Sequence, residues 1–257
     1  MKTSIILTAI LFCLALTVHG QHDTLYFIKN KVIINKQSIK KADLDSAVFY
    51  RSVVAEPDEN VFVDARDGNS YPIITIADQV WMGENLRYLP SVSGPGTLSD
   101  TDPKYYVYGY DGTDVAVAKA LDYYSTYGVL YNWPAAVNAC PSGWHIATDA
   151  EWTQLTNFAG GENAAGGKLK ETGTVHWQAP NNGATDEYGF SALPTGFLKD
   201  NGTFMYVGQY GYWWTGTESG GNNTKAWRRY MLYNNTKLNK DETSSKKQGF
   251  TVRCIKD

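Results

Sequence analysis

The chain has little of what marks most well-known classes of protein. Of its 257 residues only 3 are cysteine and 4 are histidine, and charged residues make up 19%. The 23 basic residues are fewer than the 26 acidic ones and form no stripe, so we expect no nucleic-acid partner and no electrostatic docking on a membrane. A phosphate-cradling loop, a Gly-x-Ser-x-Gly elbow and zinc-type spacings are also missing, which argues against the enzyme classes that they mark.

The longest apolar run lies at the N-terminus. Lys2 gives a positive start, Ile5 to Val18 is apolar, and Val18-His19-Gly20 is a small-residue cleavage site before Gln21. This pattern predicts a signal peptide over residues 1–20 and an exported protein, located in the periplasm, on the outer surface or in the medium. The run of about 14 residues is shorter than the roughly 20 needed to cross a bilayer, so we expect no transmembrane segment.

The chain that remains after cleavage keeps two cysteines, Cys140 and Cys254. Two thiols in an oxidising compartment usually pair. Aromatic residues are abundant, at 14% of the chain, with 18 tyrosines and 8 tryptophans. Because these two side chains combine a large apolar surface with a polar group, they suit both cores and contact loops.

Two segments follow the signal peptide. Residues 21–60 hold strand-like runs at Leu25–Ile28 and Val32–Ile34, which predict a hairpin, then an apolar cluster at Ala47–Tyr50 and a polar linker at Ala55–Asn60. So short a segment buries little core, and we interpret it as a lead-in. Residues 61–257 have a length that fits one domain.

The order of elements in residues 61–257 predicts a mixed α+β domain, with helices early and short antiparallel strands late. Pro134 predicts a helix over residues 134–139, and the capping box Thr148–Glu151 predicts a second helix that ends at Gly160-Gly161. Residues 89–124 are predicted to form a long peripheral loop. The strand-like segments are 61–63, 71–76, 79–82, 190–193, 210–214, 226–233 and 249–255.

Eight blocks of sequence occur in order along this domain. They are Asp67–Tyr71, Gln79–Leu86, Tyr127–Trp133, Ala139–His145, Gly166–Lys170, Tyr188–Pro194, Gly211–Trp214 and Gly249–Cys254. Together they closely resemble the Fibrobacter succinogenes major paralogous domain, a family of exported bacterial domains. The resemblance covers about residues 61–257, and Asp23–Tyr26 and Asp45–Tyr50 resemble a lead-in that often accompanies this domain in Bacteroidota-type bacteria.

The resemblance implies a C-type-lectin-like fold with two short helices early, short antiparallel strands late and one disulfide. In lectin-like domains a cysteine that closes the first helix bonds to one in the last strand, and Cys140 and Cys254 stand in those places. The closed loop would hold about 115 residues, and such a link stabilises a fold by about 4 to 5 kcal/mol on chain-entropy grounds.

Few residues suggest catalysis. His145 lies between Trp144 and Ile146, just before the capping box, and we expect it to pack rather than to react. Formylglycine-generating relatives of this fold use a pair of reactive cysteines, whereas the disulfide accounts for both cysteines here. Asp149 and Glu151 are better explained as helix-start charges than as a glycosidase pair. We therefore expect no enzyme, and keep a relative of the formylglycine-generating proteins as a minor alternative.

Calcium is the cofactor that the resemblance to C-type lectins suggests. Many sugar-binding C-type lectins hold the ligand through calcium with a Glu-Pro-Asn or Gln-Pro-Asp loop and a Trp-Asn-Asp strand, and residues 61–257 contain neither. Glu56-Pro57-Asp58 is similar but lies in the linker. We interpret the oxygen-rich loops as solvated turns, with calcium binding as the alternative, and predict no required cofactor. These loops are Ser99–Asp102, Asp111–Asp114 and Asp200-Asn201.

The remaining candidate is a ligand surface between Gln209 and Asn239. Aromatic rings, amides and an acid are mixed there, which suits recognition of sugars or proteins. We predict that Trp213 and Trp214 fill the core and that the connecting loops are exposed. The candidate ligand-binding residues are Glu218, Asn222, Asn223, Trp227, Arg229, Tyr233 and Asn235.

These features predict a secreted or surface-associated binding protein, not an enzyme, that recognises glycans or envelope proteins. A structural or matrix component of the cell surface is the main alternative, because residues 23–50 offer strands that a partner can extend. A resemblance in fold supplies no function by itself, so the ligand and the oligomeric state stay open.

Overall fold

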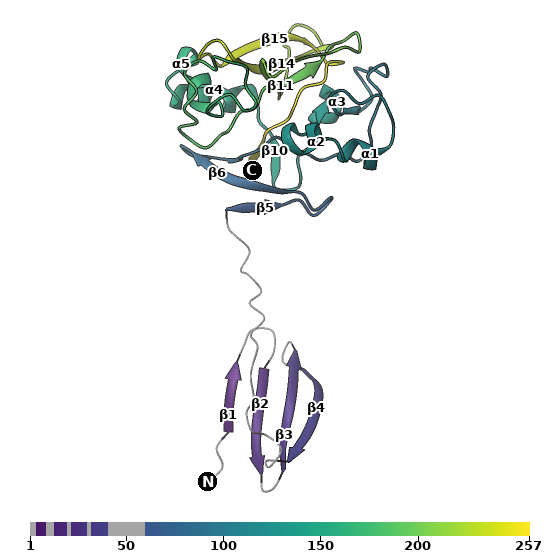
Figure 1. Cartoon of the computed structure of the whole chain (residues 1–257), viewed down its shortest axis with the longest axis vertical. Coiled ribbons are helices and arrows are strands. Elements are labelled where there is room, and N and C mark those ends of the chain that lie inside the picture. The colour runs from purple at the N-terminus through teal and green to yellow at the C-terminus, as the bar shows by residue number, and fades with distance from the viewer. Residues whose placement is uncertain (1–3, 9–12, 20–21, 30–31, 41–59) are drawn as a thin grey trace. The chain divides into compact units, whose positions relative to one another are not determined.

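The computed structural model describes residues 4–8, 13–19, 22–29, 32–40 and 60–257 (Figure 1). The chain forms two compact units, Met1–Glu56 and Pro57–Asp257. The first holds an antiparallel sheet in the order β1-β2-β3-β4, with β1 Ser4–Thr8, β2 Cys13–His19, β3 His22–Lys29 and β4 Val32–Lys40.

Some predictions for the first unit meet described residues and others do not. The two strands predicted at Leu25–Ile28 and Val32–Ile34 lie within β3 and β4, which pair antiparallel. The cleavage point at Gly20-Gln21, the apolar cluster at Ala47–Tyr50 and Glu56-Pro57-Asp58 lie outside the described residues. The signal peptide and the linker therefore stay predictions.

The first and last parts of the second unit meet in one five-stranded antiparallel sheet. Its order is β10-β16-β7-β6-β5, with β10 Trp144–Ile146, β16 Cys254–Lys256, β7 Gln79–Met82, β6 Ser70–Ile76 and β5 Val61–Val63. The strands predicted from residues 61 to 82 are confirmed. The turn between β5 and β6 contains Gly68 at φ 78°, a left-handed conformation that suits glycine.

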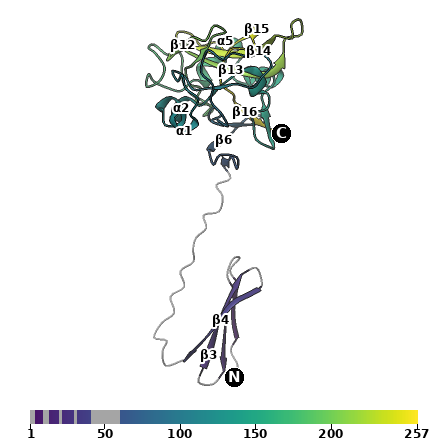
Figure 2. The ribbon, with the colours of Figure 1, turned by 90° about the vertical axis from the view of Figure 1, so that its right-hand side faces the viewer.

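A second antiparallel sheet, β13-β14-β15, consists of β13 Tyr210–Glu218, β14 Lys225–Leu232 and β15 Asn239–Ser245. Two short pairs complete the strands: β8 Tyr105–Tyr106 with β9 Leu130–Tyr131, and β11 Thr195–Leu198 with β12 Phe204–Val207. Figure 2 shows β12 at the same end of the unit as β13, β14 and β15.

Two strand predictions are corrected. Residues 190–193 are not a strand, because Ser191 has a φ of 48° and donates from its amide and hydroxyl to the Asp186 carboxylate. Residues 249–255 form a strand only at their end, where β16 begins at Cys254, and the residues before it make isolated bridges to other segments.

Both predicted helices are present, as α3 Trp133–Ala136 and α4 Asp149–Phe158, although α3 ends three residues before the predicted end at Ala139. The capping box forms as expected, since the Thr148 hydroxyl accepts from the Glu151 amide and the Glu151 carboxylate accepts from Thr148. Three further helices were not predicted: α1 Val115–Lys119, α2 Asp122–Tyr127 and α5 Glu162–Leu169. Within the described residues no helix is long and apolar enough to cross a membrane.

The prediction of a long peripheral loop over residues 89–124 is wrong in part, because much of the stretch is irregular but it is not peripheral. This stretch contains β8, α1 and the start of α2, and it buries Leu89, Val107 and Tyr124 in the main core cluster. The prediction relied on its serine, glycine and aspartate content. The apolar residues between those polar ones anchor the stretch in the core.

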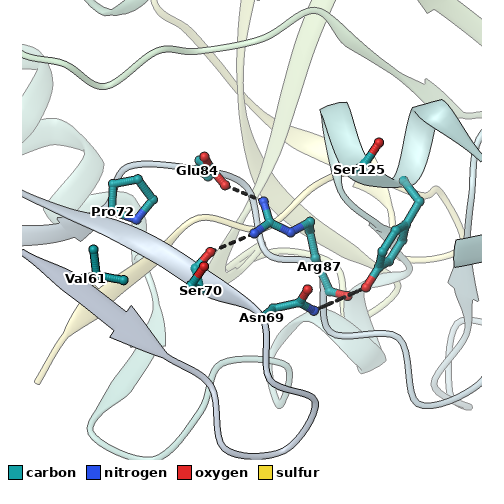
Figure 3. Close-up of a pocket in the computed structure, with 8 residues that line it drawn as sticks. Val61, Asn69, Ser70, Pro72, Glu84, Arg87 and Ser125 are labelled. Carbon is teal, nitrogen blue, oxygen red and sulfur yellow. Dashed lines mark hydrogen bonds and ion pairs between the residues drawn. The ribbon is translucent and has the colours of Figure 1, made fainter. Parts of the chain in front are cut away.

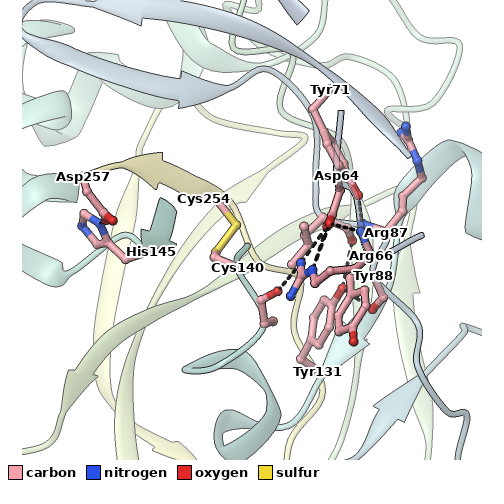
Figure 4. Close-up of a disulfide and its surroundings, with 12 residues drawn as sticks. Asp64, Arg66, Tyr71, Arg87, Tyr88, Tyr131, Cys140, His145, Cys254 and Asp257 are labelled. Atoms are coloured by element: carbon pink, nitrogen blue, oxygen red, sulfur yellow. Dashed lines mark hydrogen bonds and ion pairs between the residues drawn. A yellow bond between two sulfur atoms is a disulfide. The ribbon is translucent and has the colours of Figure 1, made fainter. Parts of the chain in front are cut away.

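The disulfide forms between Cys140 and Cys254, with the two Cα atoms 5.9 Å apart (Figure 4). It ties the segment after α3 to the last strand, as the resemblance implied. Trp213 and Trp214 are fully buried, one in each of the two largest core clusters, which confirms the prediction for both. The second unit is therefore an α+β domain of short helices and mostly antiparallel strands, closed by one disulfide.

Candidate binding surface

The predicted ligand residues do not come together at one place. Glu218, Asn222 and Asn223 lie at the connection from β13 to β14, whereas Tyr233 and Asn235 follow the other end of β14. Because β14 runs from Lys225 to Leu232 and a strand rises about 3.3 Å per residue, roughly 23 Å of strand separates the two groups. One ligand contact shared by all of them is therefore not supported.

The group at the β13–β14 connection is largely engaged in the fold. The Glu218 carboxylate is ion-paired with Lys246, whose ammonium lies 4.2 Å from the centre of the Trp133 ring. Asn222 accepts from the amide and the hydroxyl of Thr224 and so shapes the turn. Asn223 is exposed, as predicted.

The group after β14 is organised by a buried lysine. The Lys170 ammonium donates to the backbone oxygens of Asn182, Leu232 and Asn235 at 3.0 to 3.1 Å. Burial lowers the pKa of Lys170 to about 8. Several carbonyl oxygens converge on this ammonium, so the positive charge at this point comes from the protein itself. Tyr233 packs partly against the second core cluster.

Arg229, predicted to contact a ligand, is buried and bound within the fold. It is only 2% exposed, and its guanidinium donates to the Asp149 carboxylate at 2.6 and 2.9 Å and to the Thr153 hydroxyl at 2.7 Å. Its role is to hold α4 on the sheet. Trp227 is half-buried, at an irregularity of β14, with the Lys240 ammonium 5.8 Å from its ring centre.

A different group of side chains forms a continuous aromatic surface, which we call the tyrosine row: Tyr206, Tyr210, Tyr212 and Tyr230. Successive ring centres are 4.9, 5.7 and 5.6 Å apart. Tyr210 and Tyr212 alternate along β13 and therefore share a face, and Tyr212 lies directly opposite Tyr230 of β14. Tyr206 is 41% exposed, Tyr210 and Tyr230 are half-buried, and Tyr212 is buried.

The hydroxyl groups of the tyrosine row are not used by the fold. None of the four makes a hydrogen bond to any residue that the structure describes, whereas the hydroxyls of Tyr106, Tyr123, Tyr124 and Tyr131 donate to backbone oxygens. Burial raises the pKa of Tyr212, so its hydroxyl stays protonated and able to donate. The row presents both ring surface and free hydrogen-bonding groups.

Two further features support the row as a site. Tyr206 has a φ of 65°, a conformation that a bulky residue seldom adopts and that costs of the order of 1 to 3 kcal/mol. Arg228 lies 5.0 and 5.3 Å from the ring centres of Tyr212 and Tyr230, and its charge is balanced by Asp241 at 2.8 Å. Backbone strain of this kind clusters at functional positions, so the conformation of Tyr206 supports the tyrosine row as a binding site.

A hollow of about 460 Å³ lies beside β5 and β6 (Figure 3). Arg87 is held at its wall, paired with Glu84 and donating to the backbone oxygen of Ser70 at 2.7 Å. Asn69 donates to the Tyr124 hydroxyl, which itself donates to the backbone oxygen of Arg87. The polar groups of this hollow mainly satisfy one another.

A smaller hollow of about 200 Å³ shares Glu84 and Arg87 and has Arg253 at its wall. Arg253 is buried and donates to the Asn85 amide oxygen and to the backbone oxygens of Met82 and Phe190. The same Asn85 oxygen accepts from the Trp213 indole at 2.8 Å. These bonds form a buried hub that joins four distant segments.

The two histidines of the second unit each pair with acids. His145 lies 2.7 Å from the Asp257 carboxylate (Figure 4) and 2.9 Å from the Glu151 carboxylate. Partial burial disfavours its charge, but the hydrogen bonds and charges of the two carboxylates outweigh this and raise the pKa of His145. His176 pairs with Glu171 at 2.9 Å. Across the described part of the chain, no three histidine, cysteine or acidic residues gather as a metal-ligand set.

Most of the second unit is similar to a known family of domains. Residues 74–256 match the Fibrobacter succinogenes major domain. The chain belongs to this family. No curated protein and no solved structure gives a match to it.

The fold explains why the blocks that resemble the Fibrobacter succinogenes major domain carry the residues they do. Asn85, Phe190, Trp213 and Arg253 come from four of those blocks and meet in the buried hub. Gly166 and Gly167 lie on α5 against the backbone of Lys237 and Gly183, where a side chain has no room. The blocks therefore report mainly on the fold of the family.

The tyrosine row was only partly visible in the sequence. The alternation of Tyr210 and Tyr212 along one strand was a usable signal, because alternate residues share a face. Tyr230 and Tyr206 lie on other strands, and only the register of β13 with β14 and the turn after β12 bring them alongside.

Proposed function

We propose that this protein is an exported, non-enzymatic binding protein whose ligand-contacting surface is the tyrosine row. The observation that supports it best is the set of four neighbouring tyrosines whose hydroxyls make no bond within the described residues. Tyrosine supplies large contact area and hydrogen bonding at low entropic cost, which suits a recognition surface. Glycans and proteins of the cell envelope are the ligands to which such a surface would be exposed.

Binding is favoured over catalysis by the use of the titratable groups. Glu151 caps α4 and pairs with His145, while Asp149 pairs with Arg229. Each of these acids has a structural partner that accounts for its position. A matrix role, the main alternative, would leave the tyrosine hydroxyls and the strained Tyr206 backbone without an explanation.

The experiment compares binding by the oxidised, exported protein with binding by two variants, using glycan arrays and envelope fractions. Tyr210→Ser with Tyr230→Ser removes the two half-buried members of the row, and Tyr188→Ser is the matched control at a half-buried tyrosine outside the row. We expect a ligand that is lost with the double substitution and kept by the control. A ligand retained by the double variant would refute the row as the binding surface.

A further inference from the structure

We propose that the tyrosine row binds an extended neutral glycan without calcium. This inference rests on the function proposed above and adds the class of ligand. It follows from three properties of the row: the chemistry of its free groups, its charge and its spacing.

The free groups of the row are phenol hydroxyls, each of which can donate one hydrogen bond and accept others. Sugar hydroxyls have the same dual capacity, so the two sets can pair in several arrangements. The apolar C–H faces of a sugar ring can pack on the exposed ring of Tyr206. An apolar protein patch is a poorer fit, because it would bury the hydroxyls of Tyr210 and Tyr230 without partners, at a cost of about 1 to 3 kcal/mol each.

The charge of the row favours an uncharged ligand. Among the described residues, the cation that lies against rings of the row is Arg228, over Tyr212 and Tyr230, and it is already paired with Asp241 at 2.8 Å. An acidic polysaccharide would need free basic groups, and phosphate or carboxylate recognition usually relies on unpaired arginine. The row offers none among its described neighbours.

The spacing of the row favours a chain over a single sugar. The ring centres of Tyr206, Tyr210 and Tyr212 follow one another at 4.9 and 5.7 Å, and Tyr230 lies 5.6 Å from Tyr212 on the neighbouring strand, so the row covers more than one sugar ring. Alternation along β13 and the register of β13 with β14 place Tyr210, Tyr212 and Tyr230, and the turn after β12 places Tyr206 beside them. A rigid row of this kind loses little entropy on binding.

Calcium is not needed to shape this surface. The Lys170 ammonium already gathers three backbone oxygens at the C-terminal end of β14, next to the row, and the row is built on paired strands. The ligand contact predicted here uses hydroxyls and ring surface alone. Binding in the presence of EDTA is therefore part of the inference.

The test measures affinity by calorimetry in EDTA, with cellohexaose, xylohexaose and mannohexaose as neutral probes and polygalacturonate and heparin as acidic ones. Tyr210→Phe and Tyr230→Phe remove only the hydroxyls and leave the rings in place. Tyr188→Phe is the matched control, since Tyr188 is also half-buried and lies outside the row. We expect a neutral probe to bind, each row substitution to weaken it by about 2- to 10-fold, and the control to leave it unchanged.

The outcomes separate this inference from the proposed function. Binding of acidic probes only, binding lost in EDTA, or neutral binding unaffected by the row substitutions would each overturn the neutral-glycan inference. An envelope protein that binds the wild type and is lost with Tyr210→Ser and Tyr230→Ser, with no glycan bound, would overturn the inference and leave the proposed function standing. A ligand insensitive to every row variant would overturn both.

Discussion

Arg228 and Arg229 are neighbours in the sequence, yet the two faces of the β13–β14 sheet use them in opposite ways. Arg229 is 2% exposed and is bound by Asp149 and Thr153 against α4. Arg228 points to the other face, beside the tyrosine row, with Asp241 as its partner. One face is closed by a helix, and the other is left partly open to solvent.

The difference extends beyond the two arginines. On the closed face, the Trp213 indole donates to Asn85, and that amide also serves Arg253. On the open face, the hydroxyls of Tyr210 and Tyr230 have no partner among the described residues. Because buried polar groups are normally bonded, the closed face has the pattern of a core. The open face has the free hydroxyls that the proposed binding surface requires.

The largest expected effect comes from the link that closes the fold. Replacing Cys140 and Cys254 together by serine should lower the free energy of unfolding by about 4 to 5 kcal/mol, because the unfolded chain regains the freedom of a long loop. Denaturant unfolding monitored by tryptophan fluorescence measures it. The control is the wild type under reducing and oxidising conditions. A variant as stable as the wild type would show that the disulfide adds nothing to the fold.

The next effect separates the two arginines directly. Arg229→Met should destabilise by about 3 kcal/mol, because it leaves the Asp149 carboxylate without its partner in a mostly buried place. Arg228→Met should cost about 1 kcal/mol or less, since its pair with Asp241 is more exposed. Thermal and urea unfolding check both values.

A double variant sharpens this comparison. Adding Asp149→Leu to Arg229→Met removes the unpaired charge as well, and much of the lost stability should return. If the double variant is as unstable as Arg229→Met alone, the cost arises from packing and not from the buried ion pair. Equal losses for Arg228→Met and Arg229→Met would remove the distinction between the faces.

The sequence predicted those parts of the fold that depend on local chemistry. The capping box at Thr148 and Glu151 marked α4 because both bonds lie within one turn. By contrast, α5 carries two glycines and no side-chain cap, and it forms because Gly166 and Gly167 pack against distant backbone. A contact between segments far apart in the chain leaves no local signal.

The grouping of the candidate ligand-binding residues also depends on contacts that leave no local signal in the sequence. Glu218 to Asn235 is a continuous stretch of sequence, and its polar and aromatic content suggested one surface. The antiparallel return of β14 instead places the two ends of that stretch at opposite ends of a strand. Register also decided that Arg229 faces α4 and that Tyr230 faces Tyr212. No propensity of a single residue could predict those directions.

A smaller effect tests the unused hydroxyls. Tyr131→Phe should cost about 1 kcal/mol of stability, because its buried hydroxyl donates to the backbone oxygen of Tyr88 at 2.8 Å. Tyr230→Phe should leave the free energy of unfolding unchanged, since its hydroxyl bonds to no described residue. Chemical denaturation compares the two. A loss at Tyr230 equal to that at Tyr131 would mean that the row does serve the fold.

The side chain of His145 pairs with two acids but is 38% exposed, so it is intermediate between the buried Arg229 pair and the hydroxyls of the tyrosine row, which bond to no described residue. Its pKa is raised above the ordinary 6.5, so the stability it contributes is complete below about pH 6.5 and is lost as the pH rises through the folded-state value. The pKa of Glu151 is lowered, so its contribution is present above its ordinary 4.5 and is lost as the pH falls below that. The pair is therefore most favourable between these two pH values.

Solvent exposure limits this pH effect to less than about 1 kcal/mol. Between pH 6 and pH 9, the melting temperature of the wild type should fall more than that of His145→Gln, which keeps hydrogen bonding but does not titrate. Calorimetry at matched ionic strength measures the difference. Parallel curves for the two proteins would show that the charged histidine contributes nothing to the fold.

The smallest change in stability is expected where the open face is strained. Tyr206→Gly relieves a left-handed backbone that costs about 1 kcal/mol or more, but it adds about 0.5 to 1 kcal/mol of entropy to the unfolded chain. The variant should therefore be as stable as the wild type or up to about 1 kcal/mol more stable. Tyr210→Gly, on a strand with ordinary geometry, should be clearly less stable.

Tyr206→Gly is most informative when its stability and its ligand binding are measured together. If Tyr206 is held in a strained conformation for recognition, Tyr206→Gly gains or keeps stability while it weakens ligand binding, the trade-off expected of a functional residue. If the strain serves packing against Tyr210, at 4.9 Å, the same variant loses stability. Urea unfolding alongside calorimetry with the neutral glycan distinguishes the two, because only the first case separates the two quantities.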